Sequence, residues 1–189
     1  MLSLWVLRHA AAEEQAPGRR DFERALSERG RRQAEAIRAR YGGDSEQAVL
    51  PSLVLVSPAR RARQTAEIAF GGIRGCELVV EEGIYRAGAD ELMALVADLE
   101  AHPEGTVPRQ VALVGHNPAV ALFARALLSE GEEASSPPGA AEALRRSYPP
   151  ATLARFEVPT ERWDAPLWGV GRLVELFSPG VRNCSANYH

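Results

Sequence analysis

The chain has 189 residues, of which 46% are hydrophobic, and a formal net charge of −3, which favours one globular domain over residues 1–189 with a substantial core. The weakly negative net charge argues against nucleic acid as a partner. No apolar run approaches the length of about 18 residues that is needed to cross a bilayer, so we expect no membrane partner and a cytoplasmic location. All 22 basic residues are arginine, which excludes lysine Schiff-base chemistry. Neither the two distant cysteines nor the four histidines have the spacing of a metal site, so we expect no metal or other cofactor.

The chain begins with an apolar run that is followed at once by two polar residues. Residues 3–7 are predicted to form a buried strand, and Arg8 and His9 come directly after it. A polar loop follows over residues 11–20. Ser27 is then suited to cap a helix that runs from Glu28 to about residue 40.

A second apolar run, residues 53–56, leads into an arginine-rich helix predicted over residues 59–70. Arg60, Arg61 and Arg63 crowd its first turn, where the helix dipole favours anions rather than cations. Either a bound anion offsets this penalty, or the three arginines pair with surface carboxylates.

The third strand is predicted to be short and weak. It covers residues 78–80 and is followed by a loop that contains Glu81 and Glu82. Asp90 is then suited to cap a helix over residues 91–100, whose leucines and valines form an apolar stripe.

The fourth strand is predicted over residues 111–114 and ends close to His116. Asn117 and the proline after it start a helix over residues 119–128. His116 therefore lies between a buried strand and a helix N-terminus, which is where α/β folds bind ligands.

The last third of the chain is less regular. Residues 129–150 are rich in Gly, Ser, Pro and Ala and are predicted to be an insertion or flexible cover over one edge of the sheet, with a short helix at 140–146. Residues 151–158 alternate like an edge strand, and residues 172–177 form a last strand that is antiparallel to its neighbour. The tail, residues 178–189, is expected to be poorly ordered.

These elements predict an α/β fold of three layers, with a mostly parallel central sheet and an antiparallel edge strand. The carboxyl ends of parallel strands meet at one edge, which would gather Arg8, His9, Arg61 and His116. Guanidinium groups suit phosphoryl oxygens, and the neutral imidazole of His9 can take a phosphoryl group covalently. His116 could then stabilise charge in the transition state.

Four segments in this order resemble the histidine phosphatase superfamily, whose fold is called phosphoglycerate mutase-like. Residues 7–10 resemble its RHG signature, with Ala10 in place of glycine, residues 57–66 resemble its SPxxRAxQTA segment, and residues 115–118 match its second-histidine element. Residues 21–30 are similar to the DxxRxLTxxG stretch of the SixA-type phosphohistidine phosphatases. The C-terminal half of that subgroup is resembled by residues 147–152, Trp163 and residues 172–174.

The resemblance implies a metal-independent phosphatase that forms a covalent phosphohistidine on His9. The residues that it implies in holding the phosphoryl group are Arg8, Arg61, His116, Arg24 and Asn117. Many members of the family use a carboxylic acid to protonate the leaving group. Glu82, with Glu81 beside it, lies near the corresponding place, but the local pattern departs from the family and both carboxylates could equally be solvated loop residues.

The substrate implied by the SixA-type resemblance is the phosphohistidine of a protein. Members of that subgroup lack an obvious acid after the third strand, and an imidazole leaving group needs less protonation than an alkoxide. Two alternatives stay open, a phosphatase of small phosphate esters and a phosphate-binding module without catalysis.

Overall fold

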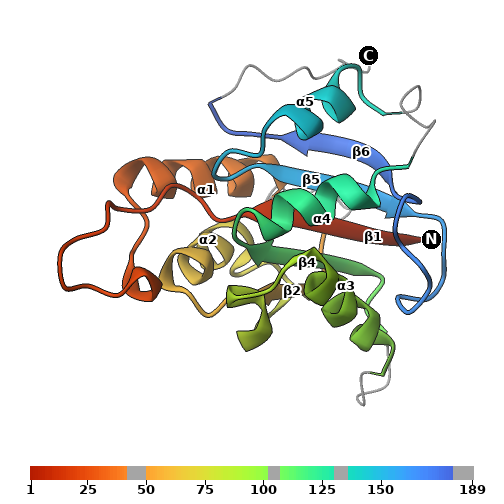
Figure 1. The fold of residues 1–189 in the computed structure, drawn as a ribbon, viewed down its shortest axis with the longest axis horizontal. Helices are drawn as coiled ribbons and strands as arrows, with labels where there is room; N and C mark the ends of the chain where they lie inside the picture. The colour runs from red at the N-terminus through yellow and green to blue at the C-terminus, as the bar shows by residue number, and fades with distance from the viewer. Residues whose placement is uncertain (42–49, 102–106, 130–135, 181–189) are drawn as a thin grey trace.

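A six-stranded sheet forms the centre of the computed structural model, which describes residues 1–41, 50–101, 107–129 and 136–180 (Figure 1). The strand order is β3-β2-β4-β1-β5-β6. The strands are β1 (Leu2–Arg8), β2 (Leu53–Val56), β3 (Glu77–Val80), β4 (Gln110–Gly115), β5 (Leu153–Val158) and β6 (Arg172–Phe177). Strands β1 to β4 are parallel to their neighbours among themselves, whereas β5 is antiparallel to β1 and to β6. The predicted α/β class, with a mostly parallel sheet and antiparallel pairing at one edge, is confirmed.

Helices cover both faces of this sheet, which gives three layers (Figure 1). One face carries α1 (Glu28–Tyr41) and α2 (Arg60–Phe70), and the other carries α3 (Ala89–Ala97), α4 (Ala119–Leu127) and α5 (Ala140–Arg146). Three short 3₁₀ helices complete the described elements: η1 (Asp21–Glu23), η2 (Glu82–Tyr85) and η3 (Asp98–Ala101).

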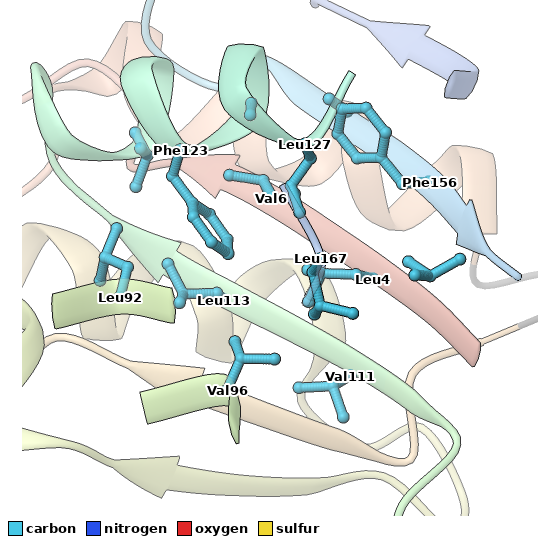
Figure 2. Packing of buried hydrophobic residues seen from close by; sticks show 14 of the residues in the cluster. Leu4, Val6, Leu92, Val96, Val111, Leu113, Phe123, Leu127, Phe156 and Leu167 are labelled. Carbon is cyan, nitrogen blue, oxygen red and sulfur yellow. The ribbon is translucent and has the colours of Figure 1, made fainter. Parts of the chain in front are cut away.

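A hydrophobic core lies on each face of the sheet, and alternate residues of β1 pack into one core or the other. This follows because successive side chains of a strand point to opposite faces. Leu4 and Val6 pack with the α3, α4 and α5 side, and Trp5 and Leu7 pack with the α1 and α2 side. Figure 2 shows the first of these cores, where side chains of α3 and α4 meet those of β1, β4 and β5. Both faces of β1 are buried, so its end is held rigidly.

The strand predicted at the sheet edge lies inside the sheet. Strand β5 pairs with β1 on one side and with β6 on the other, so β6 is outermost. The alternation that predicted an edge comes from cross-strand ion pairs with β6, which join Arg155 to Glu175 and Glu157 to Arg172. Paired charges on opposite strands give the same polar alternation as a solvated edge.

The start of α3 also differs from its prediction. The helix begins at Ala89, so Asp90 lies within its first turn and Gly88 is the cap residue. The carboxylate of Glu91 accepts a hydrogen bond from the backbone N–H of Gly88 at 2.9 Å, which is the reciprocal half of a capping box. By contrast, Ser27 caps α1 as predicted, since its Oγ accepts from the N–H of Gly30 at 3.1 Å.

The segment predicted to be an insertion or flexible cover is described from residue 136 onward, and residues 130–135 lie outside the described part. The short helix predicted within it is present as α5. Ala140, Ala141 and Leu144 of α5 are buried in the core. Of the tail, residues 178–180 are described and residues 181–189 lie outside the described part.

Candidate active site

The two histidines singled out from the sequence lie side by side at the carboxyl ends of β1 and β4. These strands are parallel, and Arg8 pairs in register with Gly115, so the next residue of each strand is His9 or His116. The backbone N–H of His9 donates to the carbonyl of Gly115 at 3.0 Å. The two imidazole rings are 5.0 Å apart between centroids, which is close enough to act on one small group.

The guanidinium group of Arg61 lies between these rings. Its Nε donates to Nε2 of His9 at 3.2 Å, and its Nη2 lies 3.4 Å from Nδ1 of His116. Arg61 belongs to the first turn of α2 and is only 6% exposed. Of the three arginines in this first turn, Arg61 is therefore accounted for by its contacts with the two histidines. Arg60 and Arg63 are exposed.

His9 is held with one ring nitrogen facing the site. Its Nδ1 lies 2.8 Å from the carbonyl oxygen of Ala10, which can only accept, so Nδ1 carries the hydrogen. The other nitrogen, Nε2, carries no hydrogen, and its lone pair accepts the hydrogen bond from Arg61. Burial, together with the charges of Arg61 and Arg8, lowers the pKa of His9 from 6.5 to about 4. His9 is thus neutral at pH 7.

His116 is also neutral and is oriented by Ser57. The hydroxyl of Ser57, which is fully buried, lies 2.7 Å from Nε2 of His116 and accepts weakly from the N–H of Ala59 at 3.4 Å. Burial first, and then the neighbouring His9 and Arg61, lower the pKa of His116 from 6.5 to about 3. The serine of the SPxxRAxQTA segment thus holds the second histidine, a role that the motif alone did not reveal.

Asp21 is the residue of this site that the sequence reasoning missed. Its carboxylate accepts from Arg61 at 2.9 Å, from Arg24 at 2.8 Å and from the Tyr85 hydroxyl at 3.2 Å. Its backbone carbonyl accepts a second hydrogen bond from Arg61 at 2.7 Å. The pKa of Asp21 is lowered from 3.8 to about 2, chiefly by the hydrogen bond from Arg24 and further by Arg61 and Tyr85. The signal was present in the DxxR stretch, where only the arginine had been considered.

The loop after β1 is fixed by side chains of α1 and α2. Thr65 accepts a hydrogen bond from the N–H of Ala10 at 3.0 Å, and Gln64 accepts one from the N–H of Leu26 at 2.8 Å. Gln33 accepts from the N–H of Ala11 at 3.0 Å. The Gln-Thr pair of the motif therefore fixes the loop that carries His9. Ala10 fits here in place of glycine because, among the described residues other than glycine, positive φ occurs at Ala151 alone.

Arg8 and Asn117 meet at one backbone carbonyl. Arg8 donates from Nη1 to the carbonyl of Tyr148 at 2.9 Å, and the side-chain amide of Asn117 donates to the same oxygen at 3.0 Å. The Nε of Arg8 is buried and has no hydrogen-bond partner within the described part of the chain. Burial lowers the pKa of Arg8, so this guanidinium group is a partly desolvated donor at the edge of the site.

Two other predicted residues lie outside the histidine pair. Arg24 contacts Asp21 and the carbonyl of Glu13, and it reaches His9 only through its electric field. Glu82 is exposed on η2. Its neighbour Glu81 accepts a hydrogen bond from the N–H of Gly83 at 3.0 Å, and the described contacts join neither glutamate to a histidine.

The described residues contain neither a cluster of metal-binding side chains nor a helix suited to cross a membrane. Across residues 1–41, 50–101, 107–129 and 136–180, no three or more His, Cys, Asp or Glu side chains are grouped so that they could hold a metal ion. None of the helices in the same ranges combines the length and the hydropathy of a bilayer-spanning segment.

The chain is similar to known proteins in part of its sequence and in its fold. A family model described as the histidine phosphatase superfamily (branch 1) matches residues 4–86. Among curated proteins, none matches the chain. Solved structures of similar fold include a provisionally named phosphohistidine phosphatase SixA from Agrobacterium tumefaciens, which is 29% identical with a TM-score of 0.72 over 94% of this chain and 98% of that one.

Two further structures carry the same name. A provisionally named phosphohistidine phosphatase SixA from Nakamurella multipartitia is 26% identical, with a TM-score of 0.75 over 95% of this chain and 96% of that one. The protein histidine phosphatase SixA in complex with tungstate is 20% identical, with a TM-score of 0.67 over 94% and 97% of the two chains, and supports the fold alone. The match over residues 4–86, together with the fold shared with these structures across the chain, makes the chain similar to the histidine phosphatase superfamily, and this similarity supports phosphatase activity.

Proposed function

We propose that the chain removes phosphate from the phosphohistidine of a protein, by way of a covalent phosphohistidine on His9. The observation that carries this proposal is the position of Arg61 between two neutral imidazoles, 3.2 Å from Nε2 of His9 and 3.4 Å from Nδ1 of His116. A phosphoryl group beside this guanidinium would lie next to a nucleophilic nitrogen and next to two sources of hydrogen bonds.

In the first step, the phosphoryl oxygens draw the Arg61 guanidinium away from Nε2 of His9, and the lone pair released on Nε2 attacks the phosphorus atom. A new N–P bond forms while the N–P bond to the substrate imidazole breaks. The substrate ring leaves as neutral imidazole, either because its other ring nitrogen is already protonated or because solvent supplies one proton. In the second step, water attacks the phosphorus of phospho-His9, the N–P bond breaks and inorganic phosphate leaves. His9 Nε2 is then free again, and the carbonyl of Ala10 has held the Nδ1 hydrogen throughout.

Transition-state charge on the phosphoryl oxygens needs fixed donors, because these are worth most where water is excluded. Arg61 is the central donor, and the unpartnered Nε of Arg8 is a second. His116 supplies a third donor once the phosphoryl group has displaced Arg61 from Nδ1 and Ser57 donates its hydroxyl hydrogen to Nε2, since Nδ1 then carries a hydrogen toward the phosphoryl group. Asn117 orients the Tyr148 carbonyl that holds Arg8. These donors provide the positive field themselves, so the proposed reaction requires no metal ion.

The absence of a contact between Glu82 and either histidine, in the described part of the chain, supports phosphohistidine over an ester as the substrate. An alkoxide leaving group depends on a positioned acid, whereas an imidazole is a better leaving group. Asp21 is close to the site, but its pKa of about 2 keeps it ionised at pH 7. Asp21 therefore has no proton to give to a leaving group, so it is not the general acid. Arg24 influences the site by its contact with Asp21.

Rapid-quench labelling tests this proposal. Wild-type protein is mixed with a radiolabelled phosphohistidine protein or with an aryl phosphate, and the acid-labile, base-stable label expected of phosphohistidine is quantified. We expect label on the wild type, faster loading from phosphohistidine than from the aryl phosphate, and no label on His9→Ala. Faster loading from the aryl phosphate would instead indicate a phosphatase of small esters. Phosphate binding without label or turnover would indicate a binding module, and full hydrolysis by His9→Ala would overturn the nucleophile assignment.

A further inference from the structure

A pocket lies next to the histidine site, along the N-terminal part of α2. It has a volume of about 620 Å³ and is lined by the loop that leads into η1 and by the first turns of α2. The lining side chains used below are Arg19, Phe22, Glu23, Arg60, Arg63 and Glu67. The residues proposed for the phosphoryl chemistry lie outside this lining, so the pocket is separate from the place where His9 would react.

The pocket is locally cationic in a chain whose formal net charge is −3. Three of its side chains are arginines, against the carboxylates of Glu23 and Glu67. Only Arg63 has an acidic partner among the described residues, a long contact of 3.9 Å to Glu67. Arg60 and Arg19 form no side-chain ion pair in the described part of the chain, so with Glu23 in the same lining the pocket has an excess of one positive charge.

The position of Arg60 and Arg63 adds to this excess of positive charge. The two residues are three apart on α2, so their side chains lie on the same helix face about 5 Å apart. The first turn of α2 contains no acidic residue, and cations at the positive end of a helix dipole are unfavourable until an anion binds there. Phe22 and Pro58 provide apolar contacts in the same pocket.

The pocket and the histidine site share two segments of chain. Arg60 precedes Arg61, which contacts His9, and Phe22 follows Asp21, which contacts Arg61. The ring of Phe22 also packs edge-on against Tyr85 at 5.1 Å. A polypeptide whose phosphorylated side chain reached His9 would therefore pass its flanking residues along this surface.

We propose that this pocket is a specificity subsite for acidic side chains that flank the phosphorylated residue of a polypeptide substrate, held by Arg19, Arg60 and Arg63. The inference rests on the proposed function. Several guanidinium groups spread over a loop and a helix suit carboxylates on separate residues of one chain, whereas one compact second phosphate would need only a single fork.

The test compares two phosphohistidine peptides, one flanked by Asp and Glu and one flanked by Ser and Ala, as substrates at low salt. The readout is the ratio of kcat/KM for the acidic peptide to kcat/KM for the neutral one. Two exposed pairs of this kind change affinity by about fivefold to tenfold, so we expect Arg60→Ala/Arg63→Ala to lower the ratio by that factor through KM. Glu23→Gln, which removes a repulsive carboxylate, should raise it.

The matched control is Arg29→Ala/Arg31→Ala, which removes the same charge from exposed positions of α1 and should leave the ratio unchanged. An equal ratio in wild type and Arg60→Ala/Arg63→Ala, or an equal fall in the α1 control, overturns the subsite. Dependence on Arg60 and Arg63 for a small bisphosphate but not for acidic peptides also overturns it. If the wild type hydrolyses neither a phosphohistidine peptide nor an aryl phosphate, the proposed function is refuted instead. The pocket can then still be tested by inhibitor binding. A phosphate-free acidic peptide that binds wild type more tightly than Arg60→Ala/Arg63→Ala would support the subsite.

Discussion

Lowering the pH from 7 to 5 is expected to destabilise the folded chain through His9 and His116. Both imidazoles are neutral in the folded protein, with pKa values of about 4 and about 3 against 6.5 when exposed. The unfolded chain therefore binds more protons than the folded chain in this range. The stability that this difference provides is complete above pH 6.5 and is lost as the pH falls toward the folded-state values.

The size of the effect follows from proton linkage. At pH 5 the unfolded imidazole is almost fully protonated and the folded one is not, so each histidine lowers the free energy of unfolding by about 2 kcal/mol relative to pH 7. The two together account for about 4 kcal/mol. Asp21 does not contribute in this window, because its pKa, depressed from 3.8 to about 2, affects stability only as the pH falls below about 4.

Urea unfolding of the wild type and of His9→Asn/His116→Asn at pH 7 and pH 5 measures this difference. We expect the wild type to lose about 4 kcal/mol more than the variant between the two pH values. His102 and His189 are present in both chains, so their contributions cancel. Equal losses in the two proteins would show that His9 and His116 titrate in the folded protein as they do in water, and the account of the site as a pair of buried neutral imidazoles would be wrong.

Three substitutions test how the site is held. Ser57→Ala removes the hydroxyl 2.7 Å from His116 and should lower kcat by about tenfold with little change in KM, in steady-state assays, because an unoriented imidazole loses about one hydrogen bond to the transition state. Tyr148→Phe removes the buried hydroxyl that donates to the carbonyl of Val6 at 2.6 Å and should cost about 1–2 kcal/mol in urea unfolding. Gly30→Ala would place a Cβ 1.9 Å from a backbone oxygen of the loop after β1, and a loss of more than about 2 kcal/mol in the same assay is expected. Wild-type values for any of the three would contradict the corresponding contact.

Much of the site was predictable because it depends on strand ends. Apolar runs fixed where β1, β2 and β4 stop, and parallel pairing then brings the residues after them to one edge. The register that pairs Arg8 with Gly115 is the physical reason why His9 and His116, far apart in the chain, come within 5.0 Å. Local pattern was sufficient here because the pairing geometry is regular.

Asp21 was not predictable in the same way. The chain has 25 acidic residues, and only its place in the DxxR stretch separates Asp21 from the others. Its role depends on where η1 lies over α2, which the hydrogen bonds from Arg61 to its carboxylate and carbonyl record. The position of β5 failed for a related reason, since alternating polarity cannot distinguish a solvated edge from a strand whose charges pair with a neighbour.

The charged groups of the site interact in pairs, from Asp21 to Arg61 and from Arg61 to His9. Arg61 is buried, and a buried cation without a partner is costly, so Asp21 compensates it when no substrate is bound. Burial keeps His9 neutral, and the charge of the same guanidinium adds to this effect. An arriving phosphoryl dianion would take over part of the role of Asp21 at Arg61, while Arg24 and Tyr85 continue to hold the displaced carboxylate. Under the proposed function, the nucleophile would therefore be neutral before substrate arrives, and the positive charge of Arg61 would become available to the phosphoryl oxygens only when they compete with Asp21 for it.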